Sequence, residues 1–296
     1  MKNLIFSITV IFALGFQAFG QDISPYIRIG ETNETMQQAT DKVVTALKEN
    51  AFRVLGVYNP SDKSHLKVIA FTRNDIKNKV VRVKDRGALA AIYKVGLVRH
   101  DGTVTLSYTN PDYILRAYLG DSYSNNARDF QKFSGDIKTA FSAIGSEFTP
   151  FGGSVQANKL KNYHYKILMP YFKDPVELKE FASFAEGLQT IEANLKAQKG
   201  KTKQVYKLVY ESQEVAVFGV GLRDKETGEA HFLPKIGEAH AAALPYEIIL
   251  QGKKATILHG KYRIALHWPD LTKGTIMKIM STPGDIEDTF EMLCQE

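Results

Sequence analysis

Two segments, TMQQATDKVVTAL at residues 35–47 and SFAEGLQTIEANL at residues 183–195, decide how this chain is organised. Each begins with a hydroxyl residue, Thr35 or Ser183, and carries Gln or Glu three residues later, which is the capping-box pattern of a helix start. Apolar residues then recur at helical spacing in both segments. We therefore expect two amphipathic helices, each lying on a sheet.

The segments around these helices repeat in the same order. Each helix is preceded by one β-branched or aromatic run and followed by two more, a hairpin and a final helix. The first set comprises 26–30, 52–58, 66–72, 90–109 and a helix from 135; the second comprises 163–168, 204–210, 214–222, 243–268 and a helix from 284. Within the second hairpin, 255–268 is expected to be one strand ending at Pro269-Asp270, as 103–109 ends at Pro111-Asp112. Either one module is present twice, or two unrelated α+β domains share similar turn signals.

This order predicts the α+β class with two tandem two-layer domains, each a mixed sheet with helices on one face. The first domain is expected at 21–148 and the second at 163–296. Pro150, Gly152 and Gly153 break any periodicity in the linker between them, 149–162. Asp174-Pro175 is typical of a helix start, so an extra helical turn is expected at 174–177.

The beginning of the chain is typical of a secretory signal peptide at residues 1–20. Lys2 precedes an apolar stretch from Leu4 to Phe16, and the small residues Ala18 and Gly20 follow. The alternative, a membrane anchor, needs roughly 17–25 apolar residues. We therefore expect a periplasmic or secreted protein that is not membrane-spanning and has no natural contact with nucleic acid. Cys294, the only cysteine, is either buried or pairs between chains.

The composition excludes disordered, collagen-like and disulfide-scaffold proteins, since 44% of the residues are hydrophobic and one is Cys. With 38 Lys plus Arg against 32 Asp plus Glu, the chain is mildly basic. Neither value indicates a particular chemistry.

The first part of the chain, from the capped helix through FRVLGV at 52–57 to the hairpin 95–109 and Asn110-Pro-Asp112, resembles the bacterial domain-of-unknown-function family three hundred and two. The resemblance covers roughly residues 24–145, and the second part is similar to the C-terminal part of longer exported members. It implies a compact two-layer domain with helices on one face of a sheet. It implies no activity, so no catalytic residue is carried over from the family.

Standard catalytic motifs are missing from the sequence. It has no Gly-x-Ser-x-Gly, His-Glu-x-x-His, Walker or Cys-x-x-Cys pattern, and no cofactor is indicated. Four histidines, His231, His240, His259 and His267, are close in sequence and raise the question of a metal site. On one strand, however, His259 and His267 would lie roughly 26 Å apart, at about 3.3 Å per residue. We therefore predict no metal site.

Candidate ligand-binding residues lie at the start and in the hairpin of the second domain. A carboxylate on a central strand, such as Glu247, is costly to bury unless it is paired or faces a wet cleft, and Lys261 and Arg263 are its expected partners. Aromatic and imidazole side chains gather near the junction of the domains, where clefts commonly bind ligands. The candidates are Tyr163, His164, Tyr165, Tyr171, Glu247 and Arg263. The alternatives are interdomain packing for the rings and a structural ion pair for Glu247.

The leading functional hypothesis is a non-catalytic exported protein that binds a small molecule or an envelope protein at the domain junction. The first alternative is an envelope hydrolase with Glu247 or His164 as general base and Arg263 stabilising an anion. The second is a structural or assembly module, which an exposed apolar patch would favour.

Overall fold

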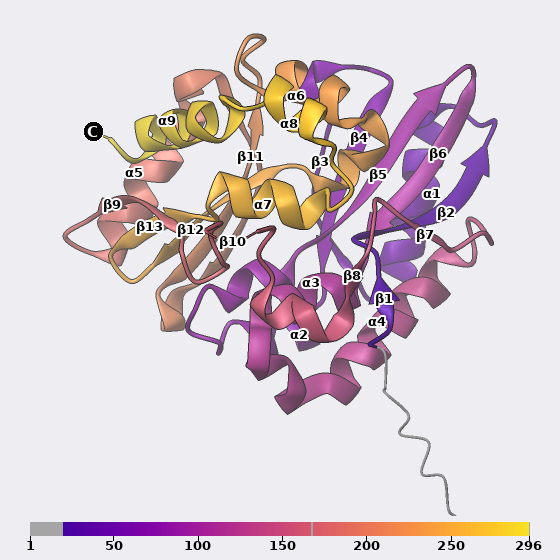
Figure 1. Ribbon diagram of the computed structural model, residues 1–296, viewed down its shortest axis with the longest axis horizontal. Helices are drawn as coiled ribbons and strands as arrows, with labels where there is room; N and C mark the ends of the chain where they lie inside the picture. Colours follow the sequence, from indigo (N-terminus) through magenta and orange to yellow (C-terminus); the bar gives the residue numbers. More distant parts are fainter. Residues whose placement is uncertain (1–19, 167, 296) are drawn as a thin grey trace, which may run out of the picture.

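The computed structural model describes residues 20–166 and 168–295, which form two main sheets with helices packed against them (Figure 1). In Figure 1 the strands of the first sheet lie on the right and those of the second on the left. The predicted signal peptide lies outside the described residues, apart from Gly20. Within the described ranges, no helix is both long and apolar enough to cross a membrane.

The first part of the chain builds a six-stranded sheet in the order β3-β4-β5-β6-β2-β7. Its elements are β2 (Tyr26–Thr32), α1 (Met36–Glu49), β3 (Arg53–Tyr58), β4 (Leu66–Thr72), α2 (Asn74–Val80), η2 (Gly87–Ala91), β5 (Tyr93–His100), β6 (Thr103–Thr109), α3 (Pro111–Leu119), α4 (Ala127–Phe141) and β7 (Thr149–Phe151). The helix α1 packs on β3, β4 and β5, and α4 packs on α1. A separate two-stranded sheet joins β1 (Asp22–Ile23) to β8 (Val155–Gln156).

The second part builds a five-stranded sheet in the order β10-β11-β12-β13-β9. Its elements are β9 (Val176–Glu180), α5 (Phe184–Lys196), β10 (Thr202–Tyr210), β11 (Val215–Leu222), α6 (Glu229–Ile236), η7 (Glu238–Ala243), β12 (Tyr246–Gln251), β13 (Lys254–Ile257), α7 (Gly260–His267), α8 (Lys273–Lys278) and α9 (Thr282–Cys294). This order repeats β3-β4-β5-β6-β2, so the two sheets have the same connectivity. The two-domain boundaries given above stay a prediction.

The sheets and helices confirm the α+β class, but the expected mixed sheets are wrong. Every strand pairing among the described residues is antiparallel. The helix α1 does join two strands that run in the same direction, β2 and β3. These strands are separated in the sheet by β4, β5 and β6, so no parallel pair forms. The same argument holds for α5, between β9 and β10.

The two predicted capped helices are present. Thr35 accepts a hydrogen bond from the N–H of Gln38, whose side chain accepts one from the N–H of Thr35, so the capping box at α1 is complete. At α5, Ser183 accepts from the N–H of Glu186, but the Glu186 carboxylate accepts from the residue before Ser183. Both helices therefore begin where the sequence predicts.

The segment before α5 is wrongly predicted. The described residues of 163–168 form no strand, and the edge strand β9 lies instead at Val176–Glu180, paired antiparallel with β13. The helical turn expected at 174–177 is therefore also wrong. The Asp174 carboxylate accepts a hydrogen bond from the N–H of Tyr171, so it closes a turn before the strand rather than capping a helix after it.

The predicted strand 255–268 is wrong as well, because β13 ends at Ile257 and α7 follows. The ring of His259 caps this helix by accepting from the N–H of Lys261 at 3.2 Å. In the first part, the side chain of Asn110 caps α3 in the same way. Asn110 therefore corresponds to His259, and the expected match of Pro111-Asp112 with Pro269-Asp270 is wrong.

The two parts of the chain share buried cores. Each of the two main apolar clusters combines residues from both sheets. The segment η7 packs on β4, β5 and β6, and η2 packs on β11, so each part covers a sheet of the other. A Cβ at Gly96 of β5 would lie 2.8 Å from the backbone nitrogen of Ala242, so this contact requires glycine. Cys294 is buried in the second cluster.

Candidate functional site

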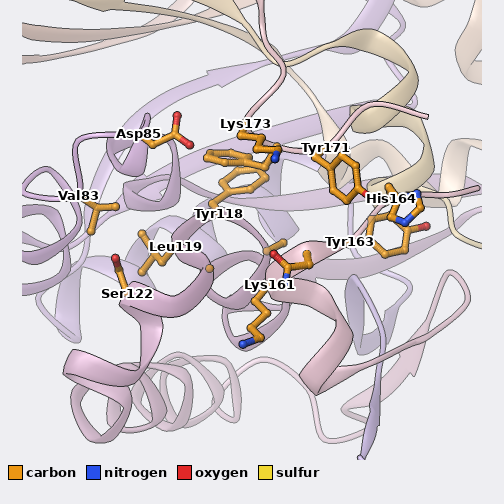
Figure 2. A pocket seen from close by; sticks show the side chains of 14 residues that line it. Val83, Asp85, Tyr118, Leu119, Ser122, Lys161, Tyr163, His164, Tyr171 and Lys173 are labelled. Carbon is orange, nitrogen blue, oxygen red and sulfur yellow. The ribbon is translucent and has the colours of Figure 1, made fainter. Parts of the chain in front are cut away.

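A cavity of about 530 Å³ lies between the end of α3 and the segment that leads into β9 (Figure 2). Its lining includes Asp85, Tyr118, Ser122, Lys161, Tyr163, His164, Tyr171, Phe172 and Lys173. Figure 2 shows Tyr163, His164 and Tyr171 together on one side, with Asp85 on the opposite side. The volume is within the range of about 300–1,000 Å³ that is typical of small-molecule sites.

The helix α3 delivers Tyr118 to this cavity. It begins at Asn110, which caps it, with proline at the first helical position, and both features favour a helix start. It ends at Gly120, whose φ of +53° favours glycine. The segment η4 (Ala157–Asn162) packs along α3 and so brings the residues that follow it to the cavity.

The rings of Tyr118 and Phe172 form one wall of the cavity. They are stacked, with centroids 5.1 Å apart and an interplanar angle of 25°. Arg86, which is 3% exposed, holds Phe172 in place. Its guanidinium lies 4.7 Å from the ring centroid and donates a hydrogen bond to the backbone carbonyl of Phe172. The wall is therefore fixed by a buried cation behind it.

The buried Tyr118 and the half-buried Tyr163 use their hydroxyl groups elsewhere. The Tyr118 hydroxyl bonds to Nε2 of His267 at 3.3 Å, and the Tyr163 hydroxyl donates to the carbonyl of Ala265 at 2.9 Å. Burial raises the pKa of Tyr163 to about 12 and that of Tyr118 further. Because α7 holds both hydroxyls, these residues offer ring surface to a ligand, and neither ionises near neutral pH.

The charges around the cavity are mostly compensated. Asp85 pairs with Arg86 at 2.7 Å, and Lys161 pairs with Asp121 at 2.8 Å. Lys173 differs: its Nζ lies 5.5 Å from the ring centroid of Tyr171, and no carboxylate within residues 20–166 and 168–295 pairs with it. The cavity therefore carries one uncompensated positive charge.

His164 shows no arrangement for acid–base catalysis. Its Nδ1 is 2.7 Å from the backbone carbonyl of Lys166, and its ring packs against Tyr171 with centroids 4.4 Å apart. A general base is normally oriented by a carboxylate or a second polar side chain. Across the part of the chain that the structure describes, no carboxylate contacts His164.

Glu247 and Arg263 lie inside the protein and not in the cavity. Glu247 forms an ion pair with Lys94 of β5, and Tyr206 donates a hydrogen bond to it at 3.1 Å. Arg263 lies 3.6 Å from the same carboxylate and 3.5 Å from the ring centroid of Tyr246. The side chains of Lys94, Glu247 and Arg263 are 7%, 8% and 2% exposed. This closed ion pair favours a structural role over catalysis.

Lys94 is the partner that the sequence reasoning missed. Lys261, one of the two expected partners, lies on the surface and lines a different groove. Burial lowers the pKa of Lys94, and the neighbouring Arg263 lowers it further, whereas Glu247 opposes this effect. Lys94 is the second residue of β5, as Glu247 is of β12. The two charges therefore occupy matching positions of the two hairpins.

The four histidines are dispersed over different structural roles, and His231 contacts the ammonium group of Lys235 on α6. His259 caps α7, and His267 lies between the hydroxyls of Tyr26 and Tyr118. His240 packs against Trp268, and burial lowers its pKa. Among the described residues, no group of three or more His, Cys, Asp or Glu side chains is placed to hold a metal ion.

The structure brings together three of the six sequence candidates. Tyr163, His164 and Tyr171 line the cavity, whereas Tyr165 lines a second groove and Glu247 and Arg263 are enclosed. The sequence reasoning missed the contributions of Tyr118, Asp85 and Lys173 to the lining. The amphipathic run of α3 could have placed Tyr118, but no local pattern indicates the other two.

Comparisons with known proteins give little further information. Neither the scan against protein-family models nor the search of curated proteins finds a match. Among solved structures, the chain is similar to the crystal structure of an uncharacterized conserved DUF302 protein from Bacillus stearothermophilus, with 12% sequence identity and a TM-score of 0.30. The match covers 45% of this chain and 99% of that one. DUF302 is the family of unknown function that the sequence analysis names as a resemblance.

Proposed function

We propose that this protein is an exported, non-catalytic binding protein that holds a small anionic, ring-bearing molecule in the cavity between α3, residues 161–164 and residues 171–173. The observation that carries the proposal is the combination of aromatic walls with the uncompensated charge of Lys173. Flat ligands stack on such rings, and a carboxylate or phosphate pairs with the ammonium group.

The lining supports binding rather than turnover. Its charged side chains other than Lys173 are already paired, and His164 is engaged with a backbone carbonyl. The other base considered for a hydrolase, Glu247, is enclosed with Lys94 and Arg263. A ligand in the cavity would therefore meet rings, hydrogen-bonding groups and one cation.

Thermal shift and calorimetry with p-coumarate and related ring carboxylates test this proposal on the full chain. A ligand at a hundred times its Kd should stabilise the folded state by about 2.7 kcal/mol. Lys173→Gln should weaken binding about tenfold, the equivalent of about 1.4 kcal/mol. The matched control is Lys203→Gln, because Lys203 is exposed on β10, away from the cavity.

A second variant tests the location. Ser122→Trp introduces a large ring at the lining and should abolish binding while the protein stays folded. If none of the ring carboxylates stabilises the protein, and native mass spectrometry of the purified chain finds no co-purifying molecule, the proposal is wrong. Equal binding by Ser122→Trp would also contradict it.

A further inference from the structure

A second hollow, of about 290 Å³, lies between α7, α8, the start of α9 and the two residues Tyr165 and Met169. Its lining is almost entirely apolar and includes Ile264, Trp268, Leu271, Ile276, Ile279 and Met280. The one charged residue in the lining is Lys261. We call this hollow the α7–α8 groove.

Large exposed apolar side chains are concentrated in the segments that line the groove. Met280 lines it and is 75% exposed, while Leu168 and Met277, next in sequence to lining residues, are 99% and 73% exposed. The other large apolar side chains exposed within the described ranges are Val57 and Met292. Exposed apolar surface gathered at one place marks a binding site more often than the same surface scattered singly.

The surroundings of the groove are positively charged. Lys166, Lys261, Lys273 and Lys278 belong to the segments that form it. The nearby carboxylates are Asp270, between α7 and α8, and Asp285 and Glu287 on α9, beyond the lining residue Pro283. Within residues 20–166 and 168–295, no carboxylate forms an ion pair with any of these four lysines. An occupant that matches this surface is apolar along its length and anionic at one end.

We propose that the α7–α8 groove binds the hydrocarbon chain of a single-chain anionic amphiphile, a fatty carboxylate, with the carboxylate at Lys261. The volume favours this occupant: at about 30 Å³ for a group of the size of water, 290 Å³ holds about ten methylene groups. A leucine or methionine side chain of a partner protein would fill only part of this space. Trp268 lines the groove and is 1% exposed, so it lies below the outer surface that a flat bilayer would touch.

The length of the chain provides a quantitative test. Each methylene moved from water into the groove should strengthen binding about fourfold, the fold-change that corresponds to about 0.8 kcal/mol. Affinity should therefore rise steeply from hexanoate to decanoate and then level off once the groove is full. An affinity independent of chain length would overturn the proposal.

Trp268 is the only tryptophan of the chain and lines the groove, so its fluorescence reports occupancy. On the full chain, ω-bromododecanoate below its micelle concentration should quench this fluorescence, and dodecanoate should compete with it. Dodecyltrimethylammonium should bind at least tenfold more weakly because its headgroup is cationic. Equal binding of the two headgroups would overturn the assignment to an anionic amphiphile.

Two variants locate the site. Met280→Glu places a negative charge at the edge and should weaken binding at least tenfold; its matched control is Met292→Glu, an exposed methionine on α9 outside the lining. Lys261→Gln should weaken dodecanoate binding but not dodecanol binding, with Lys203→Gln as control. If both glutamate variants behave alike, or if anionic vesicles bind whereas free bromododecanoate does not quench, the proposal is wrong.

Discussion

Replacing Glu229 by glutamine should stabilise the protein at neutral and alkaline pH and leave its stability in acid unchanged. Glu229 is the first residue of α6, is 0% exposed, and faces the first part of the chain. Its Oε1 accepts a hydrogen bond from the hydroxyl of Tyr58 at 2.9 Å, and its Oε2 accepts one from the N–H of Ser61 at 2.8 Å. No cation within the described ranges pairs with its carboxylate.

The magnitude follows from the pKa. Burial raises the pKa of Glu229 from the usual 4.5 to about 7, although its hydrogen bonds oppose the effect. Between these two values the folded protein keeps a proton that the unfolded chain has lost, so the free energy of unfolding falls as the pH rises through this window. At about 1.4 kcal/mol per pH unit, the loss reaches about 3 kcal/mol above pH 7.

Glutamine imitates the protonated acid. Its amide oxygen can accept from Ser61, and its amide nitrogen can donate to the Tyr58 oxygen, which rotates its own hydrogen away. In Glu229→Gln the loss between pH 4.5 and 7 should therefore be absent, so the variant should exceed the natural protein by about 3 kcal/mol at pH 8 and match it at pH 4.

Urea unfolding followed by circular dichroism, at a series of pH values from 4 to 8, measures this difference. Glu226→Gln is the matched control, because Glu226 is exposed a few residues earlier and its loss should change stability by less than about 0.5 kcal/mol at any pH. If Glu229→Gln is as stable as the natural protein or less stable at pH 8, burial of the ionised Glu229 carboxylate does not lower the free energy of unfolding, and the prediction is wrong.

Three further predictions concern the ion pair, the thiol and the leader. Lys94→Met should lower the free energy of unfolding in urea by about 3 kcal/mol, since Glu247 would keep only Arg263 as a cationic neighbour; a loss below about 1 kcal/mol would contradict this. The Cys294 thiol should not react with Ellman's reagent in the native protein and should react after unfolding in guanidinium, because burial raises its pKa to about 12; fast native labelling would refute its burial. The protein exported from a bacterial host should begin at Gln21 by N-terminal sequencing, and a chain that retains residue 1 would contradict the signal peptide.

Local sequence patterns predicted the elements whose own residues specify them. The capped helices α1 and α5, the strand pairs after them and the first hairpin are confirmed. The wrong strand prediction at 255–268 occurs where a short helix begins at a residue type that is uncommon for that position. Histidine is an uncommon helix cap, so His259 did not indicate that a helix, α7, begins just after β13. The antiparallel sheets depend on where strands meet after folding, which no single strand encodes.

In the candidate site, too, the sequence predicted residues that are close together in the chain and missed contacts between distant segments. Tyr163, His164 and Tyr171 are near one another in sequence and line one cavity, so a local argument found them. The contact of Tyr118 with Phe172 joins distant segments. Lys94 could have been found as the partner of Glu247, because matching the two hairpins assigns them the same position with opposite charges.

Two contacts between the parts of the chain join residues that occupy equivalent positions in each part. Lys94 meets Glu247, and Tyr118 meets His267; Tyr118 lies as far beyond its cap Asn110 as His267 lies beyond its cap His259. In a two-fold symmetric dimer, residue i of one copy contacts residue j of the other and j contacts i, so a position meets its own equivalent only at the symmetry axis. In two identical copies, the position of Lys94 would set two buried lysines against each other, which is strongly unfavourable. Because both parts belong to one chain, each position can carry a different residue, and the buried contact becomes an attractive one.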